Sequence, residues 1–587
     1  MKRIFCWLLI LGTTVAGQSL RAQPPSSYEM QFNKDFLSWQ WRGQLNLNRP
    51  VWGDSRLALR ENFASNLFRD TGQNRKWRDE NDLELSWLTP VSRKWRLRTF
   101  IRSRFFSDEN SVVKFSKHVA GQEAIFTPRP HVRITPALGW TVEDNFGRQD
   151  QGFYARLGTQ INNLDMGGYL NNTELKSILR AIPGRRNQSH NISTGWQRKF
   201  SEYARDSIKI GYLYSESRFL INSQRNQEQV IINSRFLSNQ LNYKLSHSGR
   251  LIIITDLSKR DIDQTNISLN NRREETQLQN QVHYRTHWKN ASLRFGVLTS
   301  QTIDDNPGLQ TDITGKQTAL TSAIQVNPYG KNSLWGTASY TKYEFETPDT
   351  VTNNDDRDEL RFIFEGGFRH RFSPIFSAAL SGQVYLYHQI FINAERSANN
   401  NWNRILQLTA TFDHRPTARL IHRNRIQILS NFTVFDFEEF FPQIRSFVFR
   451  KLIYSDSISY KISPELSFNS FYQLEKEDNG TFLSKKFAEQ VTKTLTAHFV
   501  NIFLEVRTAA GFLFSGGISL VFRDEWNFLP AKRKVRQYRS TTPRLSMVYP
   551  TGRRLTLEAV FAPNRTSDFG RNRRSFTTGR LRMLYNF

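Results

Sequence analysis

The stretch Gly579-Arg580-Leu581-Arg582-Met583-Leu584-Tyr585-Asn586-Phe587 ends the chain and decides how the rest of it is interpreted. Successive side chains of an extended strand point to opposite faces. One face of this stretch is basic, with Arg580 and Arg582, and the other face is apolar, with Leu581, Met583, Tyr585 and Phe587. The pattern predicts a β-strand that separates a water-facing side from an apolar one.

The same alternation recurs from Leu37 onward, between connectors of two kinds. Short turns, such as residues 246–249 and 373–374, alternate with longer polar segments, such as residues 261–273, 304–316 and 347–358. Tight turns on one rim and longer loops on the other are typical of membrane β-barrels. With a further strand at Tyr28, Met30 and Phe32, the best count is about 28 strands, and 26 is the alternative.

The composition fits an all-β, up-and-down antiparallel transmembrane barrel. The chain is 13% aromatic with 45 Phe, yet its mean hydropathy is only −0.57. Strands that show alternate residues to lipid and to water average out in this way. The 81 Lys and Arg outnumber the 53 Asp and Glu and are spread along the chain rather than clustered, which argues against nucleic-acid binding.

The N-terminus has the features of a secretory signal peptide. A basic start is followed by an apolar run from Ile4 and by small residues before Gln23. We therefore expect residues 1–22 to be the signal peptide, residues 23–36 a short segment that supplies the first strand, and residues 37–587 the barrel. Cys6, the single cysteine, lies in the signal, so the mature chain would have no disulfide.

The signal peptide, the connector pattern and the terminal Phe587 together resemble Gram-negative outer-membrane β-barrel proteins as a class. The resemblance implies an outer-membrane location with both termini in the periplasm, contact with lipid and lipopolysaccharide, and assembly by the barrel assembly machinery. In this class the last strand carries an assembly signal, here Leu581, Met583, Tyr585 and Phe587. No single family follows. TonB-dependent receptors have 22 strands and an N-terminal plug, for which the expected domain layout leaves no room, and the lipopolysaccharide translocon adds a periplasmic domain.

Arginines lie opposite the apolar faces of several predicted strands. Charge on the lipid face is costly, so we expect these side chains to line the lumen or a rim. Rings of Arg and Lys are how pores favour anions. The alternative is structural: pairing with inward acids such as Glu84, Glu475 or Glu558, with Glu84 expected opposite Arg98. The candidate anion-facing residues are Arg42, Arg96, Arg98, Arg102, Arg104, Arg361, Arg369, Arg371, Arg423, Arg425, Arg580 and Arg582.

The sequence offers no catalytic or metal-binding motif, and we expect neither enzyme activity nor a cofactor. His283 and His287 would lie about 13 Å apart on a strand, too far to share a metal. The expected function is therefore a porin-like transport or secretion conduit with an arginine-rich lumen. A plug or periplasmic partner, or the barrel's own loops, would close it. The alternatives are a non-transporting scaffold or adhesion barrel that displays loops and, less favoured, a soluble secreted β-protein that binds polyanions.

Overall fold

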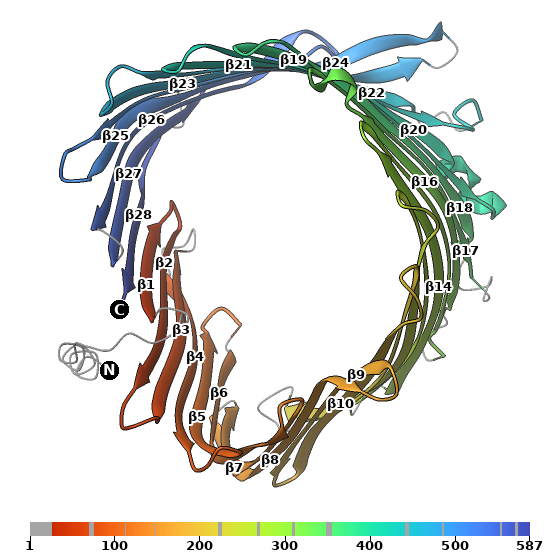
Figure 1. The fold of residues 1–587 in the computed structure, drawn as a ribbon. Coiled ribbons are helices and arrows are strands. Elements are labelled where there is room, and N and C mark those ends of the chain that lie inside the picture. The colour runs from red at the N-terminus through yellow and green to blue at the C-terminus, as the bar shows by residue number, and fades with distance from the viewer. Residues whose placement is uncertain are drawn as a thin grey trace.

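The computed structural model describes residues 26–69, 75–111, 113–145, 147–220, 226–266, 270–307, 312–347, 355–440, 445–483, 486–551, 554–569 and 573–587. These residues form one closed sheet of 28 antiparallel strands, seen end-on as a ring in Figure 1. The prediction of an all-β, up-and-down barrel with 28 strands is confirmed. The predicted signal peptide lies outside the described residues.

The strands follow one another around the ring in chain order, with two short 3-10 helices, η1 (Pro328–Gly330) and η2 (Ala394–Asn399), in connectors. The strands are β1 (Ser27–Lys34), β2 (Ser38–Pro50), β3 (Arg56–Arg69), β4 (Arg75–Pro90), β5 (Trp95–Asp108), β6 (Val113–Arg129), β7 (Val132–Asn145), β8 (Arg148–Asp165), β9 (Tyr169–Ile182), β10 (Arg185–Lys199), β11 (Ala204–Leu220), β12 (Gln227–Lys244), β13 (Gly249–Thr265), β14 (Asn270–Trp288), β15 (Ala291–Asp305), β16 (Ile313–Val326), β17 (Asn332–Glu346), β18 (Arg357–Ser373), β19 (Phe376–Phe391), β20 (Asn401–Thr417), β21 (Leu420–Phe435), β22 (Phe447–Lys461), β23 (Leu466–Leu483), β24 (Ala488–Arg507), β25 (Leu513–Asn527), β26 (Arg533–Thr551), β27 (Leu555–Asp568) and β28 (Arg574–Asn586).

The ring closes where the first described strand meets the last. β1 pairs with β28 from Ser27 opposite Asn586 to Lys34 opposite Gly579. The backbone N–H of Phe587 then donates to the carbonyl oxygen of Ser26 at 2.7 Å, so both ends of the described chain lie at the same rim. β1 has only 8 residues and β28 has 13, so Arg574–Thr578 of β28 extend past the pairing.

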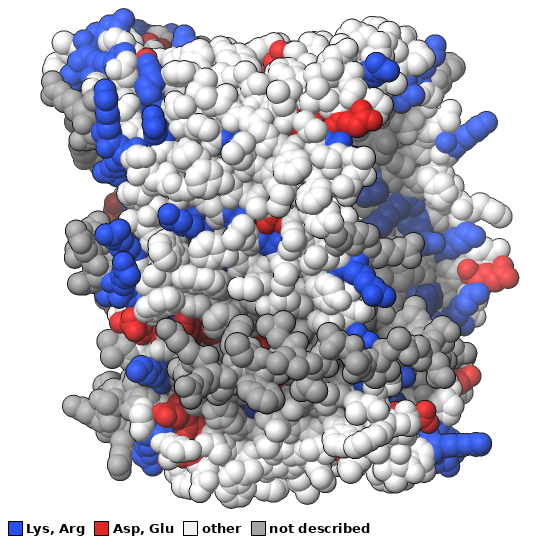
Figure 2. Space-filling model, turned by 90° about the vertical axis from the view of Figure 1, so that its left-hand side faces the viewer, with Lys and Arg blue, Asp and Glu red and all other residues white. Residues whose placement is uncertain are grey.

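The outer surface is apolar because one face of each strand carries exposed hydrophobic side chains. In β5, Leu97, Ile101 and Phe105 are exposed, and Leu545 of β26 and Leu581 of β28 are more than half exposed. Figure 2 shows the side that includes β25 to β28 and β1, where a broad surface with few charges separates Lys and Arg side chains at its two edges. Such a band between polar edges is the outer surface expected of a barrel that sits in lipid.

The two rims differ, although less than the sequence predicted. The turn rim holds Phe587 and the short connectors that follow even-numbered strands, such as residues 245–248. The loop rim holds the other connectors. Several segments predicted as loops are paired strand instead: β13 runs to Thr265 and β14 begins at Asn270, inside the predicted loop 261–273. Beyond the apolar band neither face of a strand meets lipid, so the sequence alternation disappears while the backbone pairing continues.

The wall bends sharply between β6 and β9 at a corner built on inward-facing glycines (Figure 1). Gly121 of β6 lies directly opposite Gly139 of β7. A Cβ on Gly139 would lie 2.3 Å from the carbonyl oxygen of Ala120, and one on Gly152 of β8 would lie 1.9 Å from that of Ala181. Side chains at these positions would collide with the neighbouring strand, so glycine is what permits the bend.

The corner brings inward side chains together into a small core on the inner wall. Phe100, Val119, Ala137 and Tyr154 form a buried cluster, with the rings of Phe100 and Tyr154 packed edge to face at 6.1 Å. Phe100 is only 1% exposed, whereas its outward neighbour Ile101 is 45% exposed. The inner face is therefore a packed core here, although the interior of the ring is wide elsewhere. Among the described residues, no helix is long and apolar enough to cross a membrane.

We predict that Gly139→Ala impairs folding of the barrel. The added Cβ would meet the Ala120 carbonyl oxygen at 2.3 Å and the Cα of Gly121 at 2.9 Å. Overpacking of this kind costs about 1–3 kcal/mol. The yield of folded barrel and the temperature at which it unfolds, measured by electrophoretic mobility of heated and unheated samples, should both fall.

Gly195→Ala is the matched control for this substitution. Gly195 is also an inward glycine, but its Cβ would lie 3.7 Å from the nearest backbone oxygens, which is an ordinary contact. The control should fold like the unmodified protein. Equal behaviour of the two variants would contradict the role assigned to the corner glycines.

Candidate functional site: the charged inner wall

All twelve arginines singled out by the sequence point toward the inside of the barrel. In β5, Arg96, Arg98, Arg102 and Arg104 alternate with the exposed outward residues Leu97, Ile101 and Phe105. Residues directly opposite one another on paired strands share a face, so the strand register carries this assignment around the ring. Whether these side chains attract anions depends on what lies beside them.

Seven of the twelve have a carboxylate partner. The pairs are Arg98–Glu123 (2.8 Å), Arg102–Glu84 (3.1 Å), Arg104–Glu80 (3.6 Å), Arg361–Glu359 (2.6 Å), Arg423–Asp413 (3.0 Å), Arg580–Glu558 and Arg582–Glu29 (2.7 Å). The structural reading of the inward arginines therefore applies to more than half of the set.

The predicted register between β4 and β5 was wrong. Glu84 was expected opposite Arg98, but it lies opposite Arg102, and Arg98 lies opposite Leu88. The backbone N–H groups of Val91 and Ser92 both donate to the carbonyl oxygen of Trp95, each at 3.0 Å. This turn pairs Pro90 with Arg96, which places its centre two residues later than expected and shifts every cross-strand partner by four residues.

At the corner, two buried carboxylates gather cations from neighbouring strands. Glu123 accepts from Arg98 at 2.8 Å, with Arg156 at 3.6 Å. Glu143 pairs with Lys117 at 2.8 Å, with Arg180 and Arg185 at 3.7 and 3.9 Å. Arg185 is nearly fully buried and also reaches Asp150 at 2.6 Å. These contacts tie β5 to β10 together, which is a structural role.

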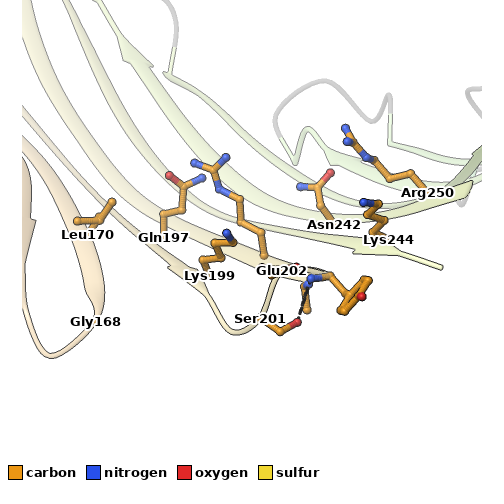
Figure 3. A pocket seen from close by; sticks show the side chains of 12 residues that line it. Gly168, Leu170, Gln197, Lys199, Ser201, Glu202, Asn242, Lys244 and Arg250 are labelled. Atoms are coloured by element: carbon orange, nitrogen blue, oxygen red, sulfur yellow. Dashed lines mark hydrogen bonds between the residues drawn. The ribbon is translucent and has the colours of Figure 1, made fainter. Parts of the chain in front are cut away.

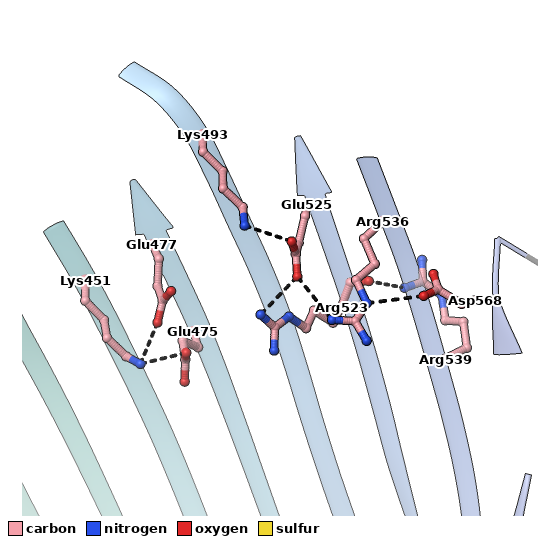
Figure 4. Close-up of polar contacts among 9 residues, drawn as sticks. All are labelled: Lys451, Glu475, Glu477, Lys493, Arg523, Glu525, Arg536, Arg539 and Asp568. Carbon is pink, nitrogen blue, oxygen red and sulfur yellow. Dashed lines mark hydrogen bonds and ion pairs between the residues drawn. The ribbon is translucent and has the colours of Figure 1, made fainter. Parts of the chain in front are cut away.

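Near the loop rim, the inner wall between β22 and β27 carries a balanced network of charges (Figure 4). Lys451 lies between Glu475 and Glu477, at 2.6 and 2.7 Å. Glu525 accepts from Lys493 at 3.0 Å and from Arg523 at 2.9 Å. Arg536 bridges from Glu525 to Asp568, at 3.8 and 3.3 Å. Glu475 therefore pairs with a lysine, and this part of the wall has little uncompensated charge.

The inner wall near the turn rim, from β10 to β21, differs because it is almost entirely basic. We name its cations the cationic arc. The arc consists of Lys199, Arg205, Lys244, Arg250, Arg285, Arg294, Lys331, Arg369, Arg371, Arg415, Arg423 and Arg425. Within the described part of the chain, Arg423 alone among them has an ion pair, with Asp413.

Three arginines of the arc stand side by side without an intervening acid. Arg250 of β13 lies directly opposite Arg285 of β14, and Arg285 lies directly opposite Arg294 of β15. Like charges at directly opposite positions of an antiparallel sheet destabilise it. A row of three such residues therefore costs stability, and its charge is not used in ion pairs among the described residues.

The arc is hollowed at two places. One hollow of about 630 Å³ is lined by Lys199, Arg205, Lys244 and Arg250, together with Gln197, Asn242 and Glu202. Figure 3 shows Lys199 on the β10–β11 hairpin, and Lys244 and Arg250 on the next one, β12–β13. The other hollow, about 580 Å³, is lined by Lys331, Arg369, Arg371 and Arg415, with Asp413 as its acid. Each hollow thus has four cations and one carboxylate.

Sequence analysis found four members of the arc, Arg369, Arg371, Arg423 and Arg425, and missed the rest. Lys199, Lys244 and Lys331 lie at or beside turns, where a shift of one residue in the assumed strand boundary moves a side chain to the other face. Arg250, Arg285 and Arg294 lie on three different strands, and only the register brings them together. A search for basic residues on inward positions beside every short turn would have found them.

Other chemistry is not indicated by the described residues. No group of three or more His, Cys, Asp or Glu within them could hold a metal ion. His283 and His287 are both on β14, and the ring of His283 hydrogen-bonds Gln281 at 3.0 Å. The residues of the expected assembly signal face outward on β28, and the ring of Phe587 packs on that of Tyr585 at 4.9 Å.

Removal of the buried Glu143 carboxylate should destabilise the corner. Glu143→Ala leaves Lys117 and Arg180 without their carboxylate and Arg185 with Asp150 alone. Breaking a buried ion pair by removing one partner costs about 3–5 kcal/mol, so the unfolding temperature of the barrel should fall clearly. Glu80→Ala, which removes the partner of Arg104 at an exposed pair, is the control and should change it little. An equal effect of both substitutions would contradict the structural role of the corner network.

Comparison with known proteins gives no family. No family model matches the chain, and no curated protein matches it in sequence. Similar solved structures include the siderophore receptor PirA from Pseudomonas aeruginosa, the alcaligin outer membrane receptor FauA from Bordetella pertussis and the copper transporter OprC, each 9% identical to this chain. They cover 68%, 74% and 96% of it, and 77%, 74% and 80% of their own chains, with TM-scores of 0.34, 0.37 and 0.38. Similarity this low assigns none of their ligands to this chain. The closed antiparallel barrel with its apolar outer band is the architecture expected of outer-membrane β-barrel proteins.

Proposed function

We propose that this barrel is an outer-membrane conduit that admits or exports anionic substrates. The observation that supports this most directly is the row Arg250, Arg285 and Arg294, three cross-strand arginines on the inner wall that have no acidic partner among the described residues. Rings of Arg and Lys are a recurring way in which pores favour anions and phosphates.

The spacing of the arc supports a continuous field rather than isolated charges. Neighbouring strands lie about 4.8 Å apart, and a tilt of about 35–45° widens this to about 6–7 Å along the rim. The Debye length at physiological ionic strength is about 8 Å, so the potentials of cations on adjacent strands overlap. Charges arranged in this way raise the local concentration of anions at the entrance.

The width of the ring implies that something closes it. Barrels with 22 strands already enclose a plugged lumen, and this wall has 28. All of the described strands belong to the wall. We propose that a partner protein or the connectors of the loop rim supply the closing element, which sets the permeability of the conduit.

We further propose that the turn rim faces the periplasm and that the last strand carries the assembly signal. The short turns and the ends of the described chain share this rim, which is the periplasmic arrangement of single-chain bacterial barrels. Leu581, Met583, Tyr585 and Phe587 would be read there by the barrel assembly machinery before β28 closes on β1. The arc would then be reached from the periplasmic side.

A non-transporting scaffold or adhesion barrel is the second candidate. It is favoured by the strands that continue past the apolar band and by the balanced charges near the loop rim, which would hold displayed connectors rigidly. The longest connectors at that rim, residues 347–356, 392–400 and 436–446, follow one another between β17 and β22. Absence of ion conductance in the purified barrel would support this candidate.

Ion selectivity in planar bilayers tests the conduit. In a salt gradient the unmodified barrel should show a reversal potential of the sign expected for anion preference. The reason is that most cations of the arc have no ion pair among the described residues. Replacing Arg250, Arg285 and Arg294 with Gln should lower the anion-to-cation permeability ratio at least twofold.

The control replaces Arg42, Arg96 and Arg544 with Gln. These arginines are exposed on the inner wall outside the arc and have no ion pair among the described residues, so the change in net charge is the same. The control should alter the ratio less than the arc variant. Cation preference of the unmodified barrel would rule out the anionic substrate class.

A further inference from the structure

We propose that the cationic arc is the binding surface for an acidic protein domain that closes the barrel from the turn rim. This proposal rests on the proposed function, since it names the partner that seals the conduit. It also commits to one side of the ring, β10 to β21, as the place where that domain sits.

The length of the arc excludes a small ligand. It extends over the twelve strands from β10 to β21. At about 6–7 Å per strand along the rim, this is about 70 Å, far beyond the reach of any metabolite. Only a macromolecule with an extended acidic surface can meet these cations together.

The depth of the arc favours a docked domain over a threaded polymer. Its members lie in the turns or no more than six residues from the turn end of their strands, from Lys199 at the end of β10 to Arg425 near the start of β21. Further along the same strands several inner charges are paired, as in Arg273–Asp304 at 2.6 Å and Arg361–Glu359 at 2.6 Å. A polyanion passing along the barrel would need free cations at successive depths, whereas a domain resting on the rim needs them at one depth.

The two hollows provide positions for projecting groups of the partner. Each presents four cations with one carboxylate, and β14 to β16 separate them along the wall. Lys and Arg side chains pair with carboxylates through short, charge-assisted hydrogen bonds. Acidic loops of the partner that enter both hollows would fix its orientation as well as its position.

Elsewhere at the turn rim, inward cations without an ion pair among the described residues, such as Arg96, are scattered among paired ones. There, Arg98 is bound to Glu123, Arg580 to Glu558 and Arg582 to Glu29. A cation that already has a carboxylate partner gains little from a second one. The partner would therefore rest against one side of the ring, and a passage could open beside β1 and β28 while the domain stays attached at β10 to β21.

Site-specific photo-crosslinking in intact cells, with the full-length barrel, tests whether a protein binds at the arc. A benzophenone amino acid replaces Asn242 in the first hollow or Ser377 in the second, and a control barrel carries it at Asn46, an inward residue of β2 outside the arc. We expect both hollow positions to yield adducts with the same protein, identified by mass spectrometry, whose sequence is acidic. The Asn46 barrel should not yield it.

Charge reversal separates specific docking from chance proximity. Replacing Arg250, Arg285 and Arg294 with Glu should reduce the adduct at least tenfold, as should Gln at the same positions if Glu prevents folding. Replacing Arg42, Arg96 and Arg544 with Glu should leave the yield of the adduct unchanged. The heat-dependent electrophoretic mobility of each variant verifies that its barrel is folded.

Three results would overturn the proposal: no protein adduct at either hollow, an adduct that survives the arc substitutions, or a polysaccharide or nucleic-acid adduct in its place. Failure here is distinguishable from failure of the proposed function, because selectivity is measured on the isolated barrel. An anion-selective barrel without an adduct would retain the conduit and remove the docked domain.

Discussion

The pairing of β1 with β28 is the interaction on which the whole structure depends. Every other strand has a neighbour adjacent in sequence on each side, but these two find each other only when the chain has been laid out completely. Without their pairing the sheet would have two free edges, and unpaired backbone groups are not tolerated in the hydrocarbon of a membrane. The seam and the neighbouring β1–β2 pairing are the shortest in the ring, since β1 contributes only 8 residues to each. An ion pair between Arg582 and Glu29 reinforces it from the inside.

The inner wall shows two different uses of arginine. At the corner and near the loop rim, arginines balance carboxylates on neighbouring strands, and the result is cohesion between strands. In the cationic arc all of the arginines except Arg423 have no ion pair among the described residues, so their charge is available to a ligand. Composition does not distinguish these two situations. The neighbours across the strands do, and for that reason net basic charge alone is weak evidence for anion transport.

Much of the fold could be predicted from the sequence, because lipid imposes a period of two on the strands that cross the apolar band. Prediction failed where lipid is absent: residues 261–265 and 270–273 were expected in a loop but are strand, since polar residues on both faces hide the alternation. The inward direction of Arg102 followed from its own strand, whereas its pairing with Glu84 required the geometry of the turn at residues 91–94. Most of the arc was missed because the register between successive strands, and not the pattern within one strand, places its residues side by side.

The glycine corner has a consequence for the size of the hole. The number and tilt of the strands fix the perimeter of a closed barrel. A circle encloses the largest area for a given perimeter, so any sharp bend reduces the cross-section without removing a strand. Gly121, Gly139 and Gly152, which allow the bend, and the side chains of Phe100 and Tyr154, which fill it, therefore narrow the area that a sealing element has to span. Because a bent wall encloses a smaller area than a circular one, the three glycines reduce the cross-section through which solutes would leak in so wide a barrel.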